Sequence, residues 1–152
     1  SYEESLKRAL YLKEVIENND GYRIFYDGTR PIAKEDTIQR IFRLTWYASP
    51  FDVNAEANNG RGPADYKVSF GKGDSTIVEF KLAKSSSLKR NLENQTDIYK
   101  SASKSASDIS VVLCYSLSDI KKVNRVLKEI KKENHENIII IDATRKVSAS
   151  KA

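Results

Sequence analysis

The sequence of 152 residues contains no methionine, one cysteine, one histidine, three prolines and six glycines. The lone cysteine, Cys114, cannot form an internal disulfide, and one cysteine with one histidine cannot build a zinc site unaided. No apolar run comes near the roughly 20 residues that cross a bilayer. The low glycine and proline content, together with 9% aromatic residues, excludes a collagen-like or largely disordered chain. These absences predict a folded protein that does not span a membrane.

Size and composition predict one domain with a substantial core. The chain is 39% hydrophobic and 31% charged, which is typical of one compact domain. We expect this domain to occupy residues 1–143 and residues 144–152 to form a flexible tail. Because the sequence contains no methionine, we expect Ser1 not to be the natural start, and we expect other domains in a longer native chain. No signal-peptide pattern opens the sequence, which favours a reducing, cytoplasmic setting.

Charge is unevenly distributed along the chain. Residues 1–80 carry 11 basic and 13 acidic side chains, whereas residues 81–152 carry 15 and 8, and the overall net charge is +5. A basic half attracts polyanions, so nucleic acid is a reasonable partner. A lysine-rich solvated surface explains the same distribution, and charge alone favours that interpretation.

Hydrophobic periodicity predicts an α/β sandwich in which a mixed sheet has helices on both faces. Turn-forming residues separate three short apolar runs in the middle of the chain, which indicates an antiparallel meander. The next two strands follow helices. We expect helices at 2–18, 35–48, 86–106 and 118–133, the last capped by Ser118, and strands at 22–26, 51–57, 64–70, 75–83, 109–115 and 137–141.

Period-two alternation separates the residues of strand 75–83 into two faces. Val78 and Phe80 point to the core, and Glu79 and Lys81 point to the opposite face. Asp65 lies on the corresponding face of the preceding strand. Because neighbouring antiparallel strands bring such residues together, we expect Asp65 to approach Glu79 and Lys81.

Two converging carboxylates and an ammonium group suggest metal-dependent hydrolysis. Carboxylates repel each other unless a cation lies between them, and oxygen ligands suit Mg²⁺ or Mn²⁺. Such an ion activates a bound water and stabilises phosphate oxygens, while a lysine orients the water or helps to deprotonate it. The pattern therefore predicts hydrolysis of phosphodiester bonds. A solvent-facing Glu-x-Lys pair on an ordinary strand is the alternative.

At these residues the sequence resembles the PD-(D/E)xK nuclease superfamily. Pro63-Ala64-Asp65 is followed, after thirteen residues, by Glu79-Phe80-Lys81. The family core runs helix, three antiparallel strands, helix, strand, and residues 35–115 can be interpreted in that αβββαβ order. The resemblance implies a restriction endonuclease-like sandwich, with residues 1–34 as a helical extension and 116–143 as a final helix and strand. It also implies that Asp65, Glu79 and the backbone carbonyl of Phe80 bind the metal, while Lys81 serves the attacking water.

Flanking residues resemble branches of the same superfamily. The segment 60–65, with Glu56 upstream, is similar to the approach to the aspartate in junction-resolving and Mrr-like restriction nucleases. Glu56 is thus a further expected metal ligand, with a surface role equally open. Arg61 either contacts substrate or solvates a loop. Gln95 and Tyr99 are similar to the glutamine and tyrosine that follow the core motif in RecB-like members.

Helical spacing supports a role for Gln95. Leu88, Leu92, Gln95, Tyr99 and Ala102 form one stripe, so an amide interrupts an inward face. A buried amide needs hydrogen-bond partners, which the catalytic glutamate, a water or a substrate phosphate could supply. We therefore place Gln95 among the catalytic residues. Tyr99 is a nucleic-acid-binding candidate with a core role as the alternative.

Basic residues near this helix complete the expected nucleic-acid-binding set. Lys84, Lys89 and Arg90 lie near its start and could hold the phosphate backbone. The later helix 118–133 carries a basic face that we expect to be a solvated exterior, made of Lys121, Lys122, Arg125, Lys128 and Lys132.

Together these features predict a magnesium-dependent endonuclease that forms a domain of a larger defence or repair protein. The resemblance alone favours DNA over RNA as substrate. Many relatives of this fold act as dimers, so a homodimer is compatible with the resemblance, although no residue pattern here indicates one. Two alternatives remain: an RNA-cleaving toxin domain, and a nucleic-acid-binding module on the same fold without catalysis.

Overall fold

The computed structural model describes residues 1–32, 35–55, 66–93 and 106–146. These residues form a mixed α/β fold around a five-stranded sheet with strand order β3-β4-β5-β6-β7. β3, β4 and β5 pair antiparallel, and β5, β6 and β7 pair parallel. The expected antiparallel meander and mixed sheet are therefore confirmed. The strands are β3 (Asp52–Ala55), β4 (Tyr66–Ser69), β5 (Ser75–Leu82), β6 (Ala106–Cys114) and β7 (Ile138–Asp142).

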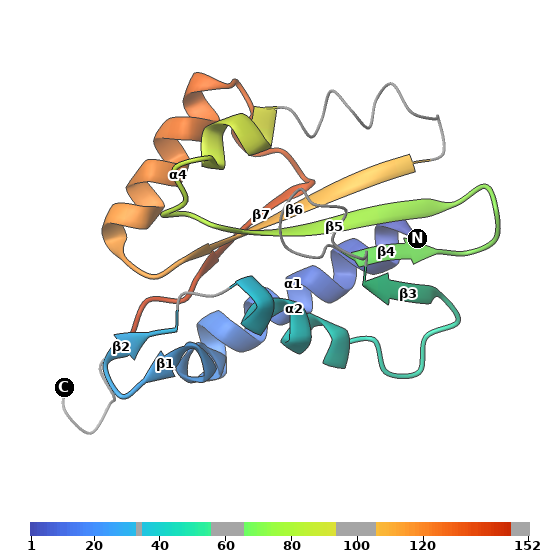
Figure 1. Cartoon of the computed structure of the whole chain (residues 1–152), viewed down its shortest axis with the longest axis horizontal. Coiled ribbons are helices and arrows are strands. Elements are labelled where there is room, and N and C mark those ends of the chain that lie inside the picture. The colour runs from blue at the N-terminus through green and yellow to red at the C-terminus, as the bar shows by residue number, and fades with distance from the viewer. Residues whose placement is uncertain (33–34, 56–65, 94–105, 147–152) are drawn as a thin grey trace.

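Helices cover both faces of this sheet (Figure 1). α1 (Tyr2–Asn18) and α2 (Glu35–Leu44) pack on one face. α4 (Leu117–Glu129) and a helical segment at residues 88–93 pack on the other. A 3-10 helix, η1 (Gly21–Phe25), and a small hairpin of β1 (Tyr26–Asp27) and β2 (Arg30–Pro31) follow α1.

The face covered by α1 and α2 holds the larger hydrophobic core. Phe42 of α2 lies against Phe80 of β5, with ring centroids 5.2 Å apart, and against Tyr66 of β4 at 5.7 Å. Val78, Phe80 and Leu82 all belong to this core, as their alternation along β5 predicts. The core includes residues from α1, η1, α2 and the four strands β4 to β7, so it fixes the position of β5.

α1 also protects the outer edge of the sheet. β7 is an edge strand, and the unpaired backbone groups of such a strand can pair with other chains. Lys13 donates a hydrogen bond to the carbonyl of Ile140, and Glu17 accepts one from the backbone N–H of Asp142 at 3.0 Å. The two side chains also form an ion pair with each other at 2.9 Å. α1 therefore satisfies backbone groups of β7 that face away from β6.

The predicted strand at 22–26 is wrong, because residues 21–25 form the 3-10 helix η1. Tyr22 and Phe25 are both buried, and a spacing of three residues returns side chains to one side of a 3-10 helix. A Cβ added at Gly21 would lie 2.6 Å from the carbonyl oxygen of Val15. Glycine thus permits the close turn that directs η1 back against α1.

Three predicted helix ends are also wrong. α4 ends at Glu129 and not at 133, because Lys131 adopts a left-handed backbone conformation with φ 58°. α2 ends at Leu44 and not at 48, because the N–H groups of Thr45 and Trp46 donate to carbonyls three residues earlier, at 3.0 and 3.2 Å. The helix predicted for 86–106 cannot reach its expected end, because β6 begins at Ala106. The small and polar residues at the start of β6 pair with β5 despite their weak strand preference.

The cap of α4 is Ser116 and not Ser118. The Ser116 hydroxyl accepts a hydrogen bond from the backbone N–H of Asp119 at 3.1 Å. The Asp119 carboxylate in turn accepts one from the N–H of Tyr115 at 2.8 Å. This reciprocal pair resembles a capping box and stabilises the first turn of α4.

Residues 144–146, the start of the expected flexible tail, are held by hydrogen bonds. Thr144 donates its N–H to the carboxylate of Asp142 at 2.9 Å. The carbonyl of Lys146 accepts a hydrogen bond from the Tyr22 hydroxyl at 3.2 Å. These contacts fix the chain after β7 against η1.

Candidate functional site

Glu79 and Lys81 form a largely buried ion pair in the middle of β5. Lys81 Nζ lies 3.2 Å from Glu79 Oε2, and the two side chains are only 13% and 7% exposed, respectively. Both residues point to the face opposite the aromatic core, as their alternation predicts. The interpretation of this pair as an ordinary solvent-facing pair is therefore wrong.

The intervening residue, Phe80, explains why the pair is held firmly. Its ring is 1% exposed and packs on Phe42 and Tyr66, with centroids 5.2 and 6.3 Å away. Rotating β5 to expose Glu79 would remove this ring from the core, which would cost several kcal/mol. The aromatic core on one face thus positions the charged pair on the other.

Neighbouring strands place specific residues beside the pair. In the parallel ladder Glu79 is opposite Ser110, which is 4% exposed, and Lys81 is opposite Val112. On the other side, the described ladder ends where Tyr66 of β4 pairs with Val78. Tyr66 directly follows Asp65 in the sequence, and Val78 directly precedes Glu79.

The backbone carbonyl of Phe80 faces the β4 side of β5. The N–H of Ala83 donates to Leu113 of β6 at 3.0 Å, so the odd-numbered residues of β5 direct their backbone groups toward β6. Backbone groups of successive residues point to opposite sides of a strand. The N–H and carbonyl of Phe80 therefore point toward β4, beyond the Tyr66–Val78 pair at which the described ladder ends. This orientation is compatible with the expected role of that carbonyl as a ligand.

Several predicted site residues lie outside the described residues. Asp65, Glu56 and Arg61 fall within 56–65, and Gln95 and Tyr99 fall within 94–105. The predicted helical stripe that contains Gln95 and Tyr99 begins with two described residues, and both face inward. Leu88 and Leu92 are 0% and 2% exposed and pack in the core beneath α4.

The three predicted phosphate-binding cations lie beside this second core. Lys84, in the turn after β5, and Arg90 are exposed. Lys89 is also exposed, and its ammonium pairs with the carboxylate of Glu129 on α4 at 3.2 Å. Lys84 and Arg90 are thus better placed than Lys89 to contact an external polyanion.

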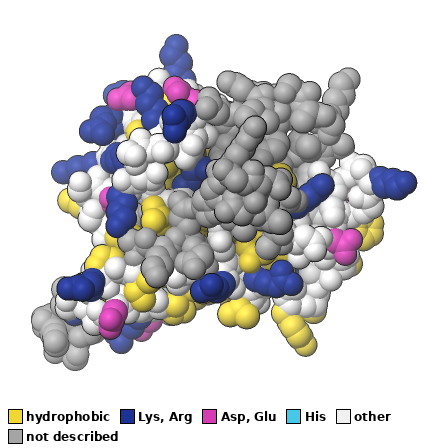
Figure 2. Space-filling view, in the orientation of Figure 1, with side chains coloured by type: hydrophobic (Ala, Val, Ile, Leu, Met, Phe, Trp, Pro, Cys, Tyr) yellow, Lys and Arg dark blue, Asp and Glu magenta, His cyan; other side chains and the backbone are white. Residues whose placement is uncertain are grey.

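The basic face of α4 is only partly a solvated exterior. Lys122 donates to the carbonyl of Ser85 at 2.8 Å, and Lys132 donates to the carbonyl of Leu92 at 2.9 Å. These two lysines hold both ends of segment 85–92 against α4, which the sequence pattern does not reveal. Figure 2 shows cations gathered over α4 with acidic side chains among them, and the exposed cations of this helix are Lys121, Arg125 and Lys128.

The only cysteine and the only histidine of the chain lie in opposite surroundings. Cys114 is fully buried, and burial raises the pKa of its thiol to about 12, so the thiol is protonated and unreactive at neutral pH. His135 is exposed in the loop before β7.

Sequence reasoning missed a pocket at the carboxyl ends of β6 and β7. This open pocket has a volume of about 470 Å³ and is lined by the β1–β2 hairpin, the start of α4, the end of β7 and the chain that follows it. Its residues are far apart in the sequence and follow no single periodicity. Only tertiary structure brings them together.

The described residues hold neither a clustered metal site nor a membrane-spanning helix. Ranges 1–32, 35–55, 66–93 and 106–146 contain no cluster of three or more His, Cys, Asp or Glu side chains placed to bind a metal. Within the same ranges, no helix combines the length and apolar character that a membrane span requires.

Comparison with known proteins gives a family. Residues 1–117 match the model of a domain of unknown function, DUF8371. The chain belongs to this family. No curated protein and no solved structure matches the chain. The DUF8371 match ends at Leu117, where α4 begins, although α4 and β7 complete the second core and the sheet.

Proposed function

We propose that this DUF8371 protein is a metal-dependent endonuclease of the restriction endonuclease-like type, with a site made by Asp65, Glu79 and Lys81. The observation that carries the proposal is the burial of Glu79 and Lys81 on a central strand. Removing a charge from water costs several kcal/mol per ion, and hydrophobic residues of similar size serve stability equally well. A catalytic role provides a reason to keep charges there.

The order of elements supports the same proposal. α2 precedes the antiparallel strands β3, β4 and β5, a helical segment at 88–93 follows, and β6 pairs parallel to β5. This succession agrees with the αβββαβ order that the resemblance implies. The end of the β4–β5 ladder, one residue from both Asp65 and Glu79, agrees with a meeting of their side chains.

The donor chemistry of these residues fits a hard divalent cation. In the proposed site the carboxylates of Asp65 and Glu79 would hold Mg²⁺ or Mn²⁺ together with the Phe80 carbonyl. The bound ion supplies an activated water and neutralises charge on the phosphate. Lys81 pairs with the carboxylate of Glu79, and its ammonium would orient the attacking water. Gln95 is proposed to orient the glutamate or a phosphate oxygen.

DNA is the proposed substrate, on the strength of the resemblance. The exposed cations Lys84, in the turn after β5, and Arg90, in the helical segment 88–93, are proposed to hold its phosphates. The proposed setting is a defence or repair protein.

The proposal is tested by incubating labelled DNA and RNA with the protein in Mg²⁺, Mn²⁺ or EDTA. We expect DNA cleavage that requires the metal and is lost in Asp65→Asn, while DNA binding is retained. The control Asp27→Asn changes an exposed aspartate of β1 and should cleave normally. Salt-sensitive binding of either nucleic acid without cleavage would replace the proposal with a binding module. Cleavage of RNA alone would favour a toxin domain.

A further inference from the structure

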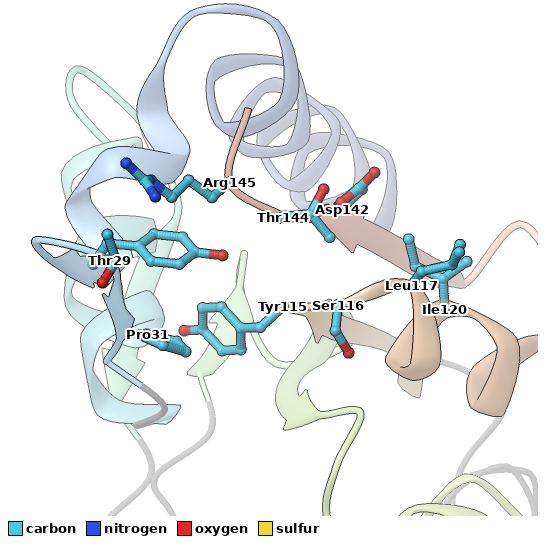
Figure 3. Close-up of a pocket in the computed structure, with 10 residues that line it drawn as sticks. Thr29, Pro31, Tyr115, Ser116, Leu117, Ile120, Asp142, Thr144 and Arg145 are labelled. Carbon is cyan, nitrogen blue, oxygen red and sulfur yellow. Dashed lines mark hydrogen bonds between the residues drawn. The ribbon is translucent and has the colours of Figure 1, made fainter. Parts of the chain in front are cut away.

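The pocket at the ends of β6 and β7 is walled by three separate parts of the chain (Figure 3). The hairpin contributes Tyr26, Thr29 and Pro31. The second wall consists of Tyr115 after β6 and the first turn of α4. The third wall follows β7. Its volume of about 470 Å³ lies within the range of small-molecule sites, and the carboxyl ends of parallel strands are a common place for them.

Hydrogen bonds from three tyrosine hydroxyls to backbone carbonyls hold these parts of the chain together. Tyr26 donates to the carbonyl of Ala143 at 2.7 Å, and Tyr115 donates to the carbonyl of Ile32 at 2.9 Å. Tyr22 fixes Lys146 in the same way at 3.2 Å. The pocket is therefore preformed, and a ligand does not have to order its walls.

Burial raises the pKa of both Tyr26 and Tyr115, so their phenols stay neutral. Their rings meet edge to face, with centroids 6.0 Å apart. Because the hydroxyls already donate to carbonyls, the rings offer mainly aromatic surface to a ligand. Pro31 and Ile120 add apolar surface. This part of the pocket suits a flat, weakly polar ring.

Charged groups of opposite sign lie on opposite sides of this surface. Arg145 and Thr29 lie on one side of the pocket, and Asp142, Ser116 and Leu117 lie on the other (Figure 3). Asp142 Oδ1 accepts the N–H of Thr144, which leaves carboxylate acceptor capacity for a ligand. Arg145 is exposed, so its guanidinium can accept an anion.

We propose that this pocket binds a nucleotide, with the base on the tyrosine wall and the phosphate at Arg145. A base carries N–H donors for the Asp142 carboxylate, and guanine carries two on one edge, so a guanine nucleotide is the expected ligand. The same chemistry is present in a free mononucleotide and in the terminal nucleotide of a strand. The pocket shares no residue with the Glu79–Lys81 site.

The proposal is tested by titrating the full chain with GMP and with guanosine in EDTA, using calorimetry. We expect GMP to bind at least about tenfold more tightly than guanosine, as one charge-assisted contact to phosphate predicts. Arg145→Gln should abolish that difference. Asp142→Asn, which keeps the acceptor for Thr144, should weaken binding of both ligands. Arg43→Gln, an exposed arginine at the end of α2, should change neither.

A competition experiment distinguishes binding of a free mononucleotide from binding of the terminal nucleotide of a strand. A short strand with a 5′-phosphorylated guanosine should displace GMP if the pocket takes strand ends, and should fail to displace it if only free nucleotides bind. No saturable GMP binding at millimolar concentration would overturn the proposal, as would a GMP preference that survives Arg145→Gln. Because EDTA prevents metal-dependent cleavage and Glu79 lies elsewhere, such a failure would leave the proposed nuclease function unaffected.

Discussion

The two faces of β5 differ sharply, although their residues alternate within one eight-residue strand. On the face toward α1 and α2, Phe80 packs among aromatic rings, and its neighbours Val78 and Leu82 are apolar. On the opposite face, Glu79 and Lys81 are buried as charges, beside a core formed by α4 and segment 88–93. The first face explains why the strand folds where it does. The second carries groups that folding alone does not require.

This contrast implies that substitutions on the two faces should affect different properties. Changes on the charged face should remove activity even in variants that still fold, whereas changes on the aromatic face should act through stability. The variants below are ordered by the size of the expected effect.

Lys81→Met should lower the rate of metal-dependent cleavage by about 10²–10⁴-fold, the range expected when a proton-transfer or water-positioning group is lost. The measurement is single-turnover cleavage at saturating protein. Lys72→Met, in the exposed turn between β4 and β5, removes the same charge and should leave the rate unchanged. An equal loss of rate in both variants would show that the lower net positive charge, and not the removal of a residue of the proposed site, slows cleavage.

Phe80→Ala should lower the free energy of unfolding by about 3–5 kcal/mol, because it removes a ring that is 1% exposed from the aromatic core. Urea denaturation measures the change. Phe70→Ala removes the same atoms from a ring that is 59% exposed and should cost much less. Similar losses at both positions would show that burial in the aromatic core is not what makes Phe80 important for stability.

Lys122→Met should lower the free energy of unfolding by about 1–2 kcal/mol, because the carbonyl of Ser85 loses a charged donor. Lys121→Met changes an exposed neighbour and should stay within about 0.5 kcal/mol of wild type. The comparison uses thermal unfolding of both variants. If Lys121→Met destabilised the protein more than Lys122→Met, Lys122 would not be the residue that holds segment 85–92.

The smallest effect concerns Cys114, in the apolar part of the charged face. Its pKa of about 12 in the folded protein exceeds the value of about 8.5 for a free thiol, so the unfolded chain loses the proton first as pH rises. Stability should therefore fall by about 1 kcal/mol between pH 7.5 and 9.5. The Cys114→Ala variant should lack this part of the pH dependence. An identical slope in both proteins would contradict the burial argument.

Alternation and turn residues predicted much of the sheet. The antiparallel meander, the core face of β5 and the opposite placement of Glu79 and Lys81 all follow from period-two patterning. Element ends were less predictable, because they depend on tertiary contacts. Gly21 turns the chain against α1, and Ser116 replaces Ser118 as the cap of α4.

The candidate site was predictable only as a set of residue types on one face. The sequence could not indicate that Glu79 and Lys81 would be buried, because burial depends on tertiary packing over that face of β5. For the same reason Lys122 and Lys132 were mistaken for solvated lysines, when they bind backbone carbonyls. The nucleotide pocket depends on three distant segments and left no local pattern.

The most direct test pairs cleavage and stability measurements on Glu79→Gln, with Glu133→Gln, an exposed glutamate after α4, as its control. If Glu79 is a metal ligand, Mg²⁺-dependent cleavage by Glu79→Gln should fall to background at a temperature where this variant is still folded, although the unpaired charge of Lys81 lowers its melting temperature. Wild-type cleavage by Glu79→Gln, or a loss of cleavage that merely accompanies unfolding, would contradict the account.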